Sequence, residues 1–171
     1  MRPATSGRSR LILFLDFDGV LHPDPCTDPE RLFEHAPRLM RVLDDFPGLG
    51  VVLSTAWRTQ RTESQLLDAL PPALRQRVLG SNPRCSDFKP PLELVPYRRH
   101  AECRQWLQDH GMGASPWWAL DDRAEGFAPY CENLIECDSR SGFDERVAAR
   151  LASVLTVARG RVTADLDLML A

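Results

Sequence analysis

Hydrophobic positions along the chain form short unbroken runs that are separated by longer segments of helical period. The short runs lack the helical period, which is typical of strands buried on both faces of a parallel sheet. These runs are Leu11–Leu15, Val51–Leu53, Arg77–Leu79, Trp117–Leu120 and Asn133–Glu136. The helical segments between and after them are Pro29–Phe46, Thr62–Leu70, Arg99–His110 and Asp144–Ala158. This alternation predicts a three-layer α/β domain with an open, mostly parallel, Rossmann-like sheet of about five strands and helices on both faces.

The remaining segments define the limits of this domain. Pro83–Pro96 is the longest stretch without a pattern, and we expect an ordered surface loop beside the functional site. Arg161–Ala171 fits either a final edge strand or a loose end. Residues 1–9 are polar and basic, and we expect a disordered tail. Residues 10–171 should therefore form a single domain with no second folding unit.

Composition excludes several classes of protein. The net charge of −3 and the isoelectric point of about 5.8 give no global basic field that would gather nucleic acid, although a local basic patch is compatible with them. The five cysteines are odd in number and contain no Cys-x-x-Cys pair, which disfavours a disulfide framework and a zinc site and favours a cytoplasmic setting. The first apolar run is too short for a signal-peptide core or a membrane span. A Walker-type phosphate loop is also missing, which disfavours an ATP-driven kinase.

Polar side chains follow three of the expected strands where each strand ends. They are Asp16 and Asp18, then Ser54 and Thr55, and finally Asp121 and Asp122. The carboxyl ends of parallel strands meet at one edge of a sheet, where ligands collect. Four carboxylates gathered there would repel one another unless a cation lay among them, and Mg²⁺ prefers carboxylates, water and phosphate oxygens. Gly19 follows the first pair and would let backbone approach a ligand closely.

Three sequence strings, in this order, resemble motifs of the haloacid dehalogenase-like (HAD) superfamily. LFLDFDGVLHP resembles the first motif, LSTAWR the second, and WWALDDRAEGF the aspartate-pair form of the fourth. The later string NLIECDSRSGF is similar to the last strand and turn of capless members. The resemblance covers Leu11–Leu155 and is closest to the capless form that includes the HAD domain of some RNA-repair proteins.

The resemblance implies a magnesium-dependent phosphatase that cleaves a phosphomonoester through an aspartyl-phosphate intermediate. Asp16 would be the nucleophile, and Asp18 would be the general acid and base. Mg²⁺ would be held by the Asp16 carboxylate, the Asp18 main-chain carbonyl and Asp121, with Asp122 nearby or acting through water.

Two further positions of the implied site are open to alternatives. Thr55 would hydrogen-bond the phosphate, with Ser54 as its rival. The lysine that normally forms the third motif is absent, and Arg99 is the first choice to replace it by position. Lys89 is the only lysine of the chain and could reach the substrate from the preceding loop. The choice matters because a planar guanidinium and a point charge contact phosphate differently.

The spacing between the motifs leaves little room for a cap domain, so we expect an open site that suits a bulky substrate. An RNA or DNA end and a phosphoprotein are the candidates. Trp57 and Arg58 could stack on a base and hold a phosphate. The alternatives are that Trp57 packs over the rim of the site and that Arg58 forms an ordinary salt bridge. His22 could touch the substrate, but we expect a solvated loop histidine.

A second hypothesis is a weakly active or inactive HAD-like module that binds a phosphorylated or nucleic-acid partner. The missing lysine favours this module. The presence of both Asp16 and Asp18 favours the enzyme, since a binding module needs neither a nucleophile nor an acid. A dehalogenase is disfavoured, because in the resembled family Asp18 marks the branch that handles phosphate.

Overall fold

The computed structural model describes residues 10–170, with side chains as far as residue 163. The expected tail over residues 1–9 lies outside the described residues. No cap domain is inserted within the described part of the chain.

The five strands form one parallel sheet in the order β3-β2-β1-β4-β5, which confirms the predicted fold class. Their bounds are β1 Ile12–Leu15, β2 Gly50–Leu53, β3 Val78–Ser81, β4 Trp117–Asp121 and β5 Leu134–Glu136. The chain runs outward from β1 through β2 to β3, then returns to the other side of β1 for β4 and β5. The crevice between β1 and β4 is therefore a topological switch point, where open α/β sheets bind their ligands.

Within residues 10–170, five α-helices and five short 3₁₀ turns connect or follow the strands. The helices are α1 Ala36–Asp44, α2 Glu63–Ala69, α3 Pro72–Arg75, α4 Arg98–Asp109 and α5 Glu145–Leu170. The 3₁₀ turns are η1 Pro29–Arg31, η2 Ala56–Thr59, η3 Cys85–Asp87, η4 Leu92–Leu94 and η5 Ala124–Gly126. Among residues 10–170, no helix combines the length and the apolarity that crossing a bilayer requires.

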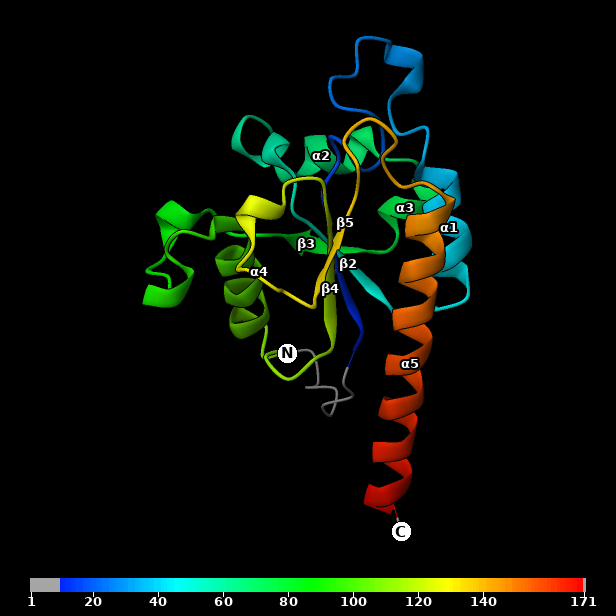
Figure 1. The fold of residues 1–171 in the computed structure, drawn as a ribbon, viewed down its shortest axis with the longest axis vertical. Coiled ribbons are helices and arrows are strands. Elements are labelled where there is room, and N and C mark those ends of the chain that lie inside the picture. The colour runs from blue at the N-terminus through cyan, green and yellow to red at the C-terminus, as the bar shows by residue number, and fades with distance from the viewer. Residues whose placement is uncertain (1–9, 171) are drawn as a thin grey trace.

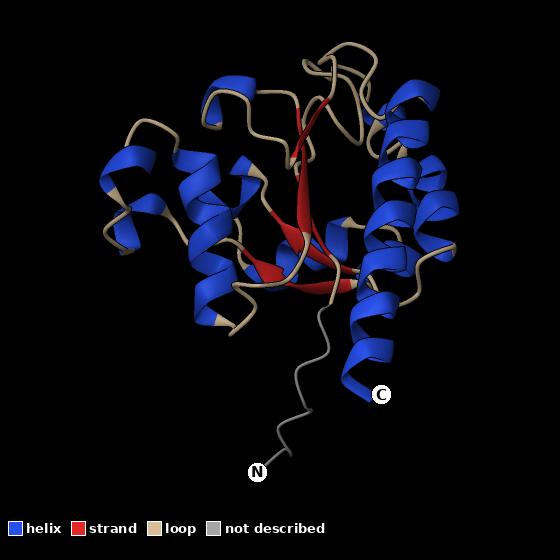
Figure 2. Cartoon of the chain, turned by 60° about the horizontal axis from the view of Figure 1, so that its bottom comes forward, coloured by secondary structure: helices blue, strands red, loops and turns tan. Residues whose placement is uncertain are grey.

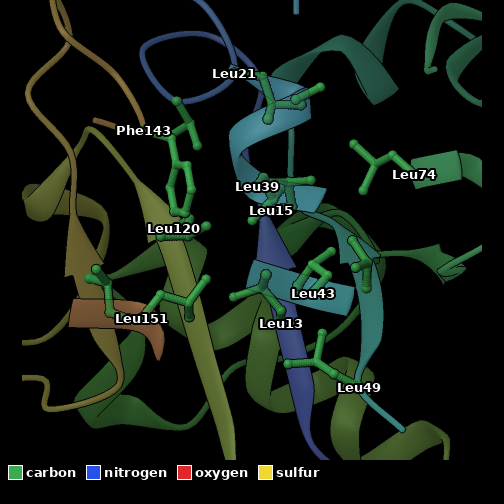
Figure 3. Packing of buried hydrophobic residues seen from close by; sticks show 14 of the residues in the cluster. Leu13, Leu15, Leu21, Leu39, Leu43, Leu49, Leu74, Leu120, Phe143 and Leu151 are labelled. Atoms are coloured by element: carbon green, nitrogen blue, oxygen red, sulfur yellow. The ribbon is translucent and has the colours of Figure 1, made fainter. Parts of the chain in front are cut away.

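The sheet lies between two helical layers, with α4 on one face and α1 and α5 on the other (Figures 1 and 2). Alternate residues of β1 supply both cores. Phe14 points to the α4 side and meets the rings of Trp106 and Trp117 edge-on, with centroids 5.9 and 5.6 Å away. Leu13 and Leu15 point to the other side, where α1 and α5 supply further leucines (Figure 3). Each fully buried leucine stabilises the fold by roughly 1.5–3 kcal/mol, which is why both faces of β1 are apolar.

The helix expected over Pro29–Phe46 is interrupted. Phe33 adopts a φ of 60°, which an α-helix cannot contain, and only Ala36–Asp44 forms α1. The Phe33 ring packs against Phe17 at 5.3 Å. This tertiary contact overrides the local helical pattern and places the ring beside the candidate site.

Both expectations for Arg161–Ala171 were wrong as far as the structure describes it, because α5 continues to Leu170. Gly160 has no positive φ and does not end the helix. The start of α5 follows the sequence pattern, since the Asp144 carboxylate accepts the Val147 N–H at 2.8 Å and caps the first turn.

Pro83–Pro96 forms a surface loop that contains η3 and η4, as predicted. The loop is tied to the elements around the candidate site. The Cys85 N–H donates to the Glu102 carboxylate of α4 at 3.1 Å, and the Arg84 guanidinium donates to the Arg58 carbonyl at 3.1 Å.

Candidate active site

The register of the sheet brings the ends of three strands to one place. Leu15 pairs with Leu53 on one side and with Leu120 on the other. The next residues, Asp16, Ser54 and Asp121, therefore follow three adjacent paired positions. Backbone bonds continue the sheet by one step: the Asp16 N–H donates to the Leu120 carbonyl at 3.1 Å, and the Ser54 N–H donates to the Leu15 carbonyl at 2.8 Å.

Three aspartates form a carboxylate cluster at this edge. Asp16, Asp121 and Asp122 each offer an oxygen, and these oxygens lie within 4.8 Å of one another. Asp16 is 3% exposed and Asp121 is 1% exposed. Asp121 Oδ2 and Asp122 Oδ1 are buried and have no hydrogen-bond partner among the described residues. Buried acceptors of this kind need a partner, and oxygen ligands at this spacing fit a hard divalent cation.

The cluster carries an electrostatic cost that a cation would relieve. Burial, followed by the charge of Asp121, raises the pKa of Asp16 to about 7. The Phe17 N–H, which donates to Asp16 Oδ1 at 2.7 Å, and the Arg99 guanidinium act in the opposite direction. Burial also raises the pKa of Asp121 to about 6. Without a cation, these groups therefore hold protons at pH values where an exposed aspartate would have lost them.

Gly19 is required by the packing of this cluster. It has a φ of +70°, and a Cβ built on it would lie 2.3 Å from Asp122 Oδ2. The close approach expected at Gly19 is thus an approach to the Asp122 carboxylate. Any side chain here would displace Asp122 from the cluster and would also strain the backbone.

Arg99 supplies positive charge next to Asp16. Its Nη2 lies 3.5 Å from Asp16 Oδ2, and its Nη1 lies 3.5 Å from the Ser54 hydroxyl. Its Nε is 3.8 Å from Asp121 Oδ2. Lys89 is exposed and forms no ion pair with the described side chains. The structure therefore favours Arg99 over Lys89 for the position of the missing lysine.

The Asp18 carboxylate is not part of the cluster of Asp16, Asp121 and Asp122 and is held by two donors. His22 Nε2 lies 3.0 Å from Asp18 Oδ1, and Trp57 Nε1 donates to Asp18 Oδ2 at 2.8 Å. The Phe33 N–H donates to His22 Nδ1 at 3.4 Å, so the neutral ring carries its proton on Nε2 and donates it to Asp18. The hydrogen bond from His22 lowers the pKa of Asp18.

The environment of His22 corrects one expectation. The side chain is 1% exposed, so it is a buried partner of Asp18 and not a solvated loop histidine. Next to His22, the His35 N–H donates to the Leu21 carbonyl at 2.9 Å and ties this loop to the start of α1. The burial of His22 could not be predicted because the Phe33 and Trp57 rings that pack against it come from segments that only the fold brings together, although Asp18 is near in the chain.

Trp57 packs at the rim of the site. Its ring meets Phe17 edge-on at 5.4 Å, and the Arg61 guanidinium lies 4.1 Å over the ring centroid. One face of the indole is thus occupied by Arg61 and its N–H by Asp18. These contacts favour the packing alternative over a platform for a base.

Arg58 and Thr55 shape the turn after β2. Arg58 forms an ion pair with Glu102 and donates to the carbonyls of Ser54 and Thr55 at 3.2 and 2.8 Å. These contacts favour the salt-bridge alternative for Arg58. The fully buried Thr55 caps η2, because its Oγ1 accepts the Trp57 N–H at 3.2 Å. The Thr55 hydroxyl keeps its own proton for another acceptor.

Asn82 belongs to the site and was missed in the sequence. It follows β3 at the same edge, is buried, and donates from Nδ2 to the Ser54 hydroxyl at 3.1 Å. Ser54 Oγ thus lies between Asn82 and Arg99 and connects the end of β3 to the Arg99 guanidinium. The signal that could have found Asn82 is its position, since it is a polar residue at the end of a predicted strand.

An arginine-lined cleft of about 440 Å³ adjoins the cluster. Arg99, whose guanidinium contacts Asp16, is one of the residues that line the cleft. The other lining residues come from η2, from the start of α4 and from the loop after β4 and are Ala56, Arg58, Thr59, Pro96, Arg98, Glu102, Arg123, Glu125 and Gly126. Gly126 leaves room for Arg99, because a Cβ at this position would lie 2.8 Å from Arg99 Cγ.

A five-stranded parallel sheet with aspartates at the ends of β1 and β4, and without a cap within residues 10–170, has the architecture of a capless domain of the HAD superfamily. The family described as the HAD domain in Swiss Army Knife RNA repair proteins matches residues 12–148. This match spans most of the chain, which therefore belongs to that family. Comparisons with curated proteins and with solved structures gave no match.

Proposed function

We propose that this HAD domain is a magnesium-dependent phosphohydrolase that cleaves a phosphomonoester through an aspartyl-phosphate on Asp16. The observation that carries the proposal is the cluster of Asp16, Asp121 and Asp122, whose carboxylate oxygens lie within 4.8 Å of one another beside Arg99 and include two buried oxygens without a hydrogen-bond partner among the described residues. A purely structural role would not gather acidic groups at this cost, because buried charges are ordinarily paired.

The donor set matches the preference of Mg²⁺ for oxygen ligands. The Asp16 and Asp121 carboxylates and the Asp18 main-chain carbonyl would hold the ion, with Asp122 nearby or acting through water. When bound, Mg²⁺ would offset the negative charge of the phosphoryl oxygens.

Two contacts support the assignment of Asp16 as the nucleophile. The Phe17 N–H fixes one oxygen of its carboxylate at 2.7 Å, and Arg99 lies beside the other at 3.5 Å. In the first step, an Asp16 oxygen bonds to phosphorus while the bond to the leaving oxygen breaks. Arg99 and the Thr55 hydroxyl, or its rival Ser54, contact the phosphoryl oxygens and balance their charge.

Asp18 moves the protons of both steps. In the first step, its protonated form gives a proton to the leaving oxygen, and in the second its carboxylate takes a proton from the attacking water. That water then displaces Asp16 from phosphorus and releases inorganic phosphate. The donors His22 and Trp57 stabilise the carboxylate, which is the form needed for the second step.

The substrate is proposed to be bulky, either an RNA or DNA end or a phosphoprotein. Support comes from the absence of a cap within residues 10–170 and from the arginine-lined cleft beside Asp16. The name of the matched family refers to RNA-repair proteins, which favours the nucleic-acid end. The cytoplasmic setting indicated by the cysteines stays a prediction.

Turnover of p-nitrophenyl phosphate with and without Mg²⁺ tests the proposal. Wild type should be active only with the ion, and Asp16→Asn should lose activity because the amide cannot accept the phosphoryl group. Asp45→Asn makes the same change at an exposed position of the described fold and should behave as wild type.

The alternative, an inactive binding module, is favoured by one observation, the presence of Arg99 where the resembled family has lysine. If wild type and Asp16→Asn were equally silent across a broad panel of phosphoesters while a phosphorylated partner still bound, the binding module would replace the enzyme.

A further inference from the structure

The arginine-lined cleft contains arginines that are not paired with the aspartates or glutamates of the candidate site. Arg99 is engaged with Asp16, and Arg58 is neutralised by Glu102 inside the cleft. Arg98 is exposed and forms no ion pair with the side chains of residues 10–163.

Arg123 is available for exchange with a ligand. Its guanidinium is 3.7 Å from Asp24, and its side chain is 62% exposed. An exposed pair of this length contributes little, so an incoming anion can replace it. Glu125 also lines the cleft, but its single negative charge is smaller than the two positive charges of Arg98 and Arg123, so the lining is net positive.

The backbone adds to this preference for anions. The cleft includes the start of α4 at Arg98, and Tyr97 before it provides no side-chain cap. The first N–H groups of a helix carry partial positive charge and favour an anion nearby. The guanidinium groups of Arg98 and Arg123 and the start of α4 thus line one space, and Arg99, which also lines it, links this space to Asp16.

We propose that this cleft binds the phosphate adjacent to the scissile one in a nucleic-acid strand. The recognised unit is then a terminal nucleotide that carries two phosphates, one at Asp16 and one between Arg98 and Arg123. This inference rests on the proposed function and assigns a substrate class to it. It favours nucleic acid over a phosphoprotein, because every internal nucleotide supplies a second phosphate, whereas a phosphopeptide supplies one only when it is phosphorylated twice.

The first test compares a nucleoside 3′,5′-bisphosphate with the matching 3′- and 5′-monophosphates. Wild type should show a lower KM for the bisphosphate, and the double variant Arg98→Ala, Arg123→Ala should lose at least about tenfold of this preference, as expected for charge-assisted hydrogen bonds. Arg104→Ala removes an exposed arginine from the same helix, outside the cleft lining, and should keep the preference.

The second test measures equilibrium binding of a short phosphorylated oligoribonucleotide to Asp16→Asn, which does not depend on turnover. When Arg98→Ala and Arg123→Ala are added to Asp16→Asn, the slope of log K against log salt should fall by about 0.7, since the contact to one phosphate of a single strand is lost. A doubly phosphorylated peptide of equal charge serves as the competitor.

The outcomes separate the two proposals. Turnover of p-nitrophenyl phosphate without any preference for the bisphosphate, or a preference that survives the double variant, would overturn the cleft assignment and leave the phosphatase standing. Binding of the peptide as tightly as the oligonucleotide, with the same dependence on Arg98 and Arg123, would overturn the nucleic-acid class. Loss of all turnover together with intact, arginine-dependent oligonucleotide binding would refute the enzyme and support the cleft.

Discussion

Replacing Asp121 with asparagine should stabilise the metal-free protein and abolish its response to Mg²⁺. The substitution removes one charge from the cluster and keeps the shape of the side chain. Oδ1 can still accept the Arg123 N–H, which it does at 2.9 Å. The ion pair with Arg99 is long, at 3.8 Å, and its attraction is outweighed by burial, which leaves the pKa of Asp121 raised.

The magnitude follows from the pKa of Asp121, which burial raises from 3.8 to about 6. At roughly 1.4 kcal/mol per pKa unit this bounds the cost of the charge at about 3 kcal/mol. Removal of one coupled charge should recover about 1–2 kcal/mol, or roughly 2–8 °C in Tm. Because the folded pKa is raised, the cost is fully present above about pH 6 and disappears as the pH falls toward 3.8.

Thermal unfolding at pH 8 and pH 4.5, with EDTA and with Mg²⁺, measures both effects. In EDTA, Asp121→Asn should unfold at a higher temperature than wild type at pH 8, with a smaller difference at pH 4.5. Mg²⁺ at ten times its Kd should stabilise wild type by about 1.4 kcal/mol and leave the variant unchanged. Glu132→Gln, an exposed charge removal, is the control. A variant that is less stable in EDTA at pH 8, or that keeps the full Mg²⁺ shift, would refute the cluster as a cation site.

Other predictions concern the groups around the cluster. Trp57→Phe removes one donor to Asp18 and should lower kcat about tenfold with little change in KM, as steady-state kinetics would show; an unchanged kcat would contradict this. Arg99→Lys keeps the charge and should retain more activity than Arg99→Ala, which should lose roughly 10²-fold. Equal rates in the two variants would contradict a role for the positive charge of Arg99. Gly19→Ala meets the Asp122 carboxylate and should destabilise the fold by about 1–3 kcal/mol in denaturant unfolding. The Kd for Mg²⁺, measured by calorimetry, should weaken as the pH falls below about 7, because protons compete for the raised-pKa carboxylates.

The sheet could be predicted from the sequence because its strands are apolar on both faces. Leu11–Leu15 has no polar position, and β1 lies at the centre of the sheet with cores on both sides. The same logic located the cluster, since aspartates after predicted strands must share one edge. Local pattern failed over Pro29–Phe46, where the contact between Phe33 and Phe17 turns the chain out of the helix.

The partners of the site residues could not be predicted, because they depend on segments far apart in the chain. Asn82 reaches Ser54 from the end of β3, and His22 becomes buried only when Phe33 folds against it. The choice between Arg99 and Lys89 depended on the path of a loop that no periodic pattern constrains. Spacing can place a charge near a helix start, but only the fold shows whether it reaches the carboxylate.

Detection of a phosphoryl group on Asp16 tests the central claim most directly. Asp18→Asn should slow release of the intermediate, while p-nitrophenolate leaves readily without an acid, so the phosphorylated enzyme should accumulate. After acid quench, peptide mass spectrometry should find phosphate on the peptide that contains Asp16, and Asp16→Asn should carry none. Turnover of p-nitrophenyl phosphate by Asp16→Asn at the rate of wild type, with no phosphorylated peptide in either protein, would contradict the account.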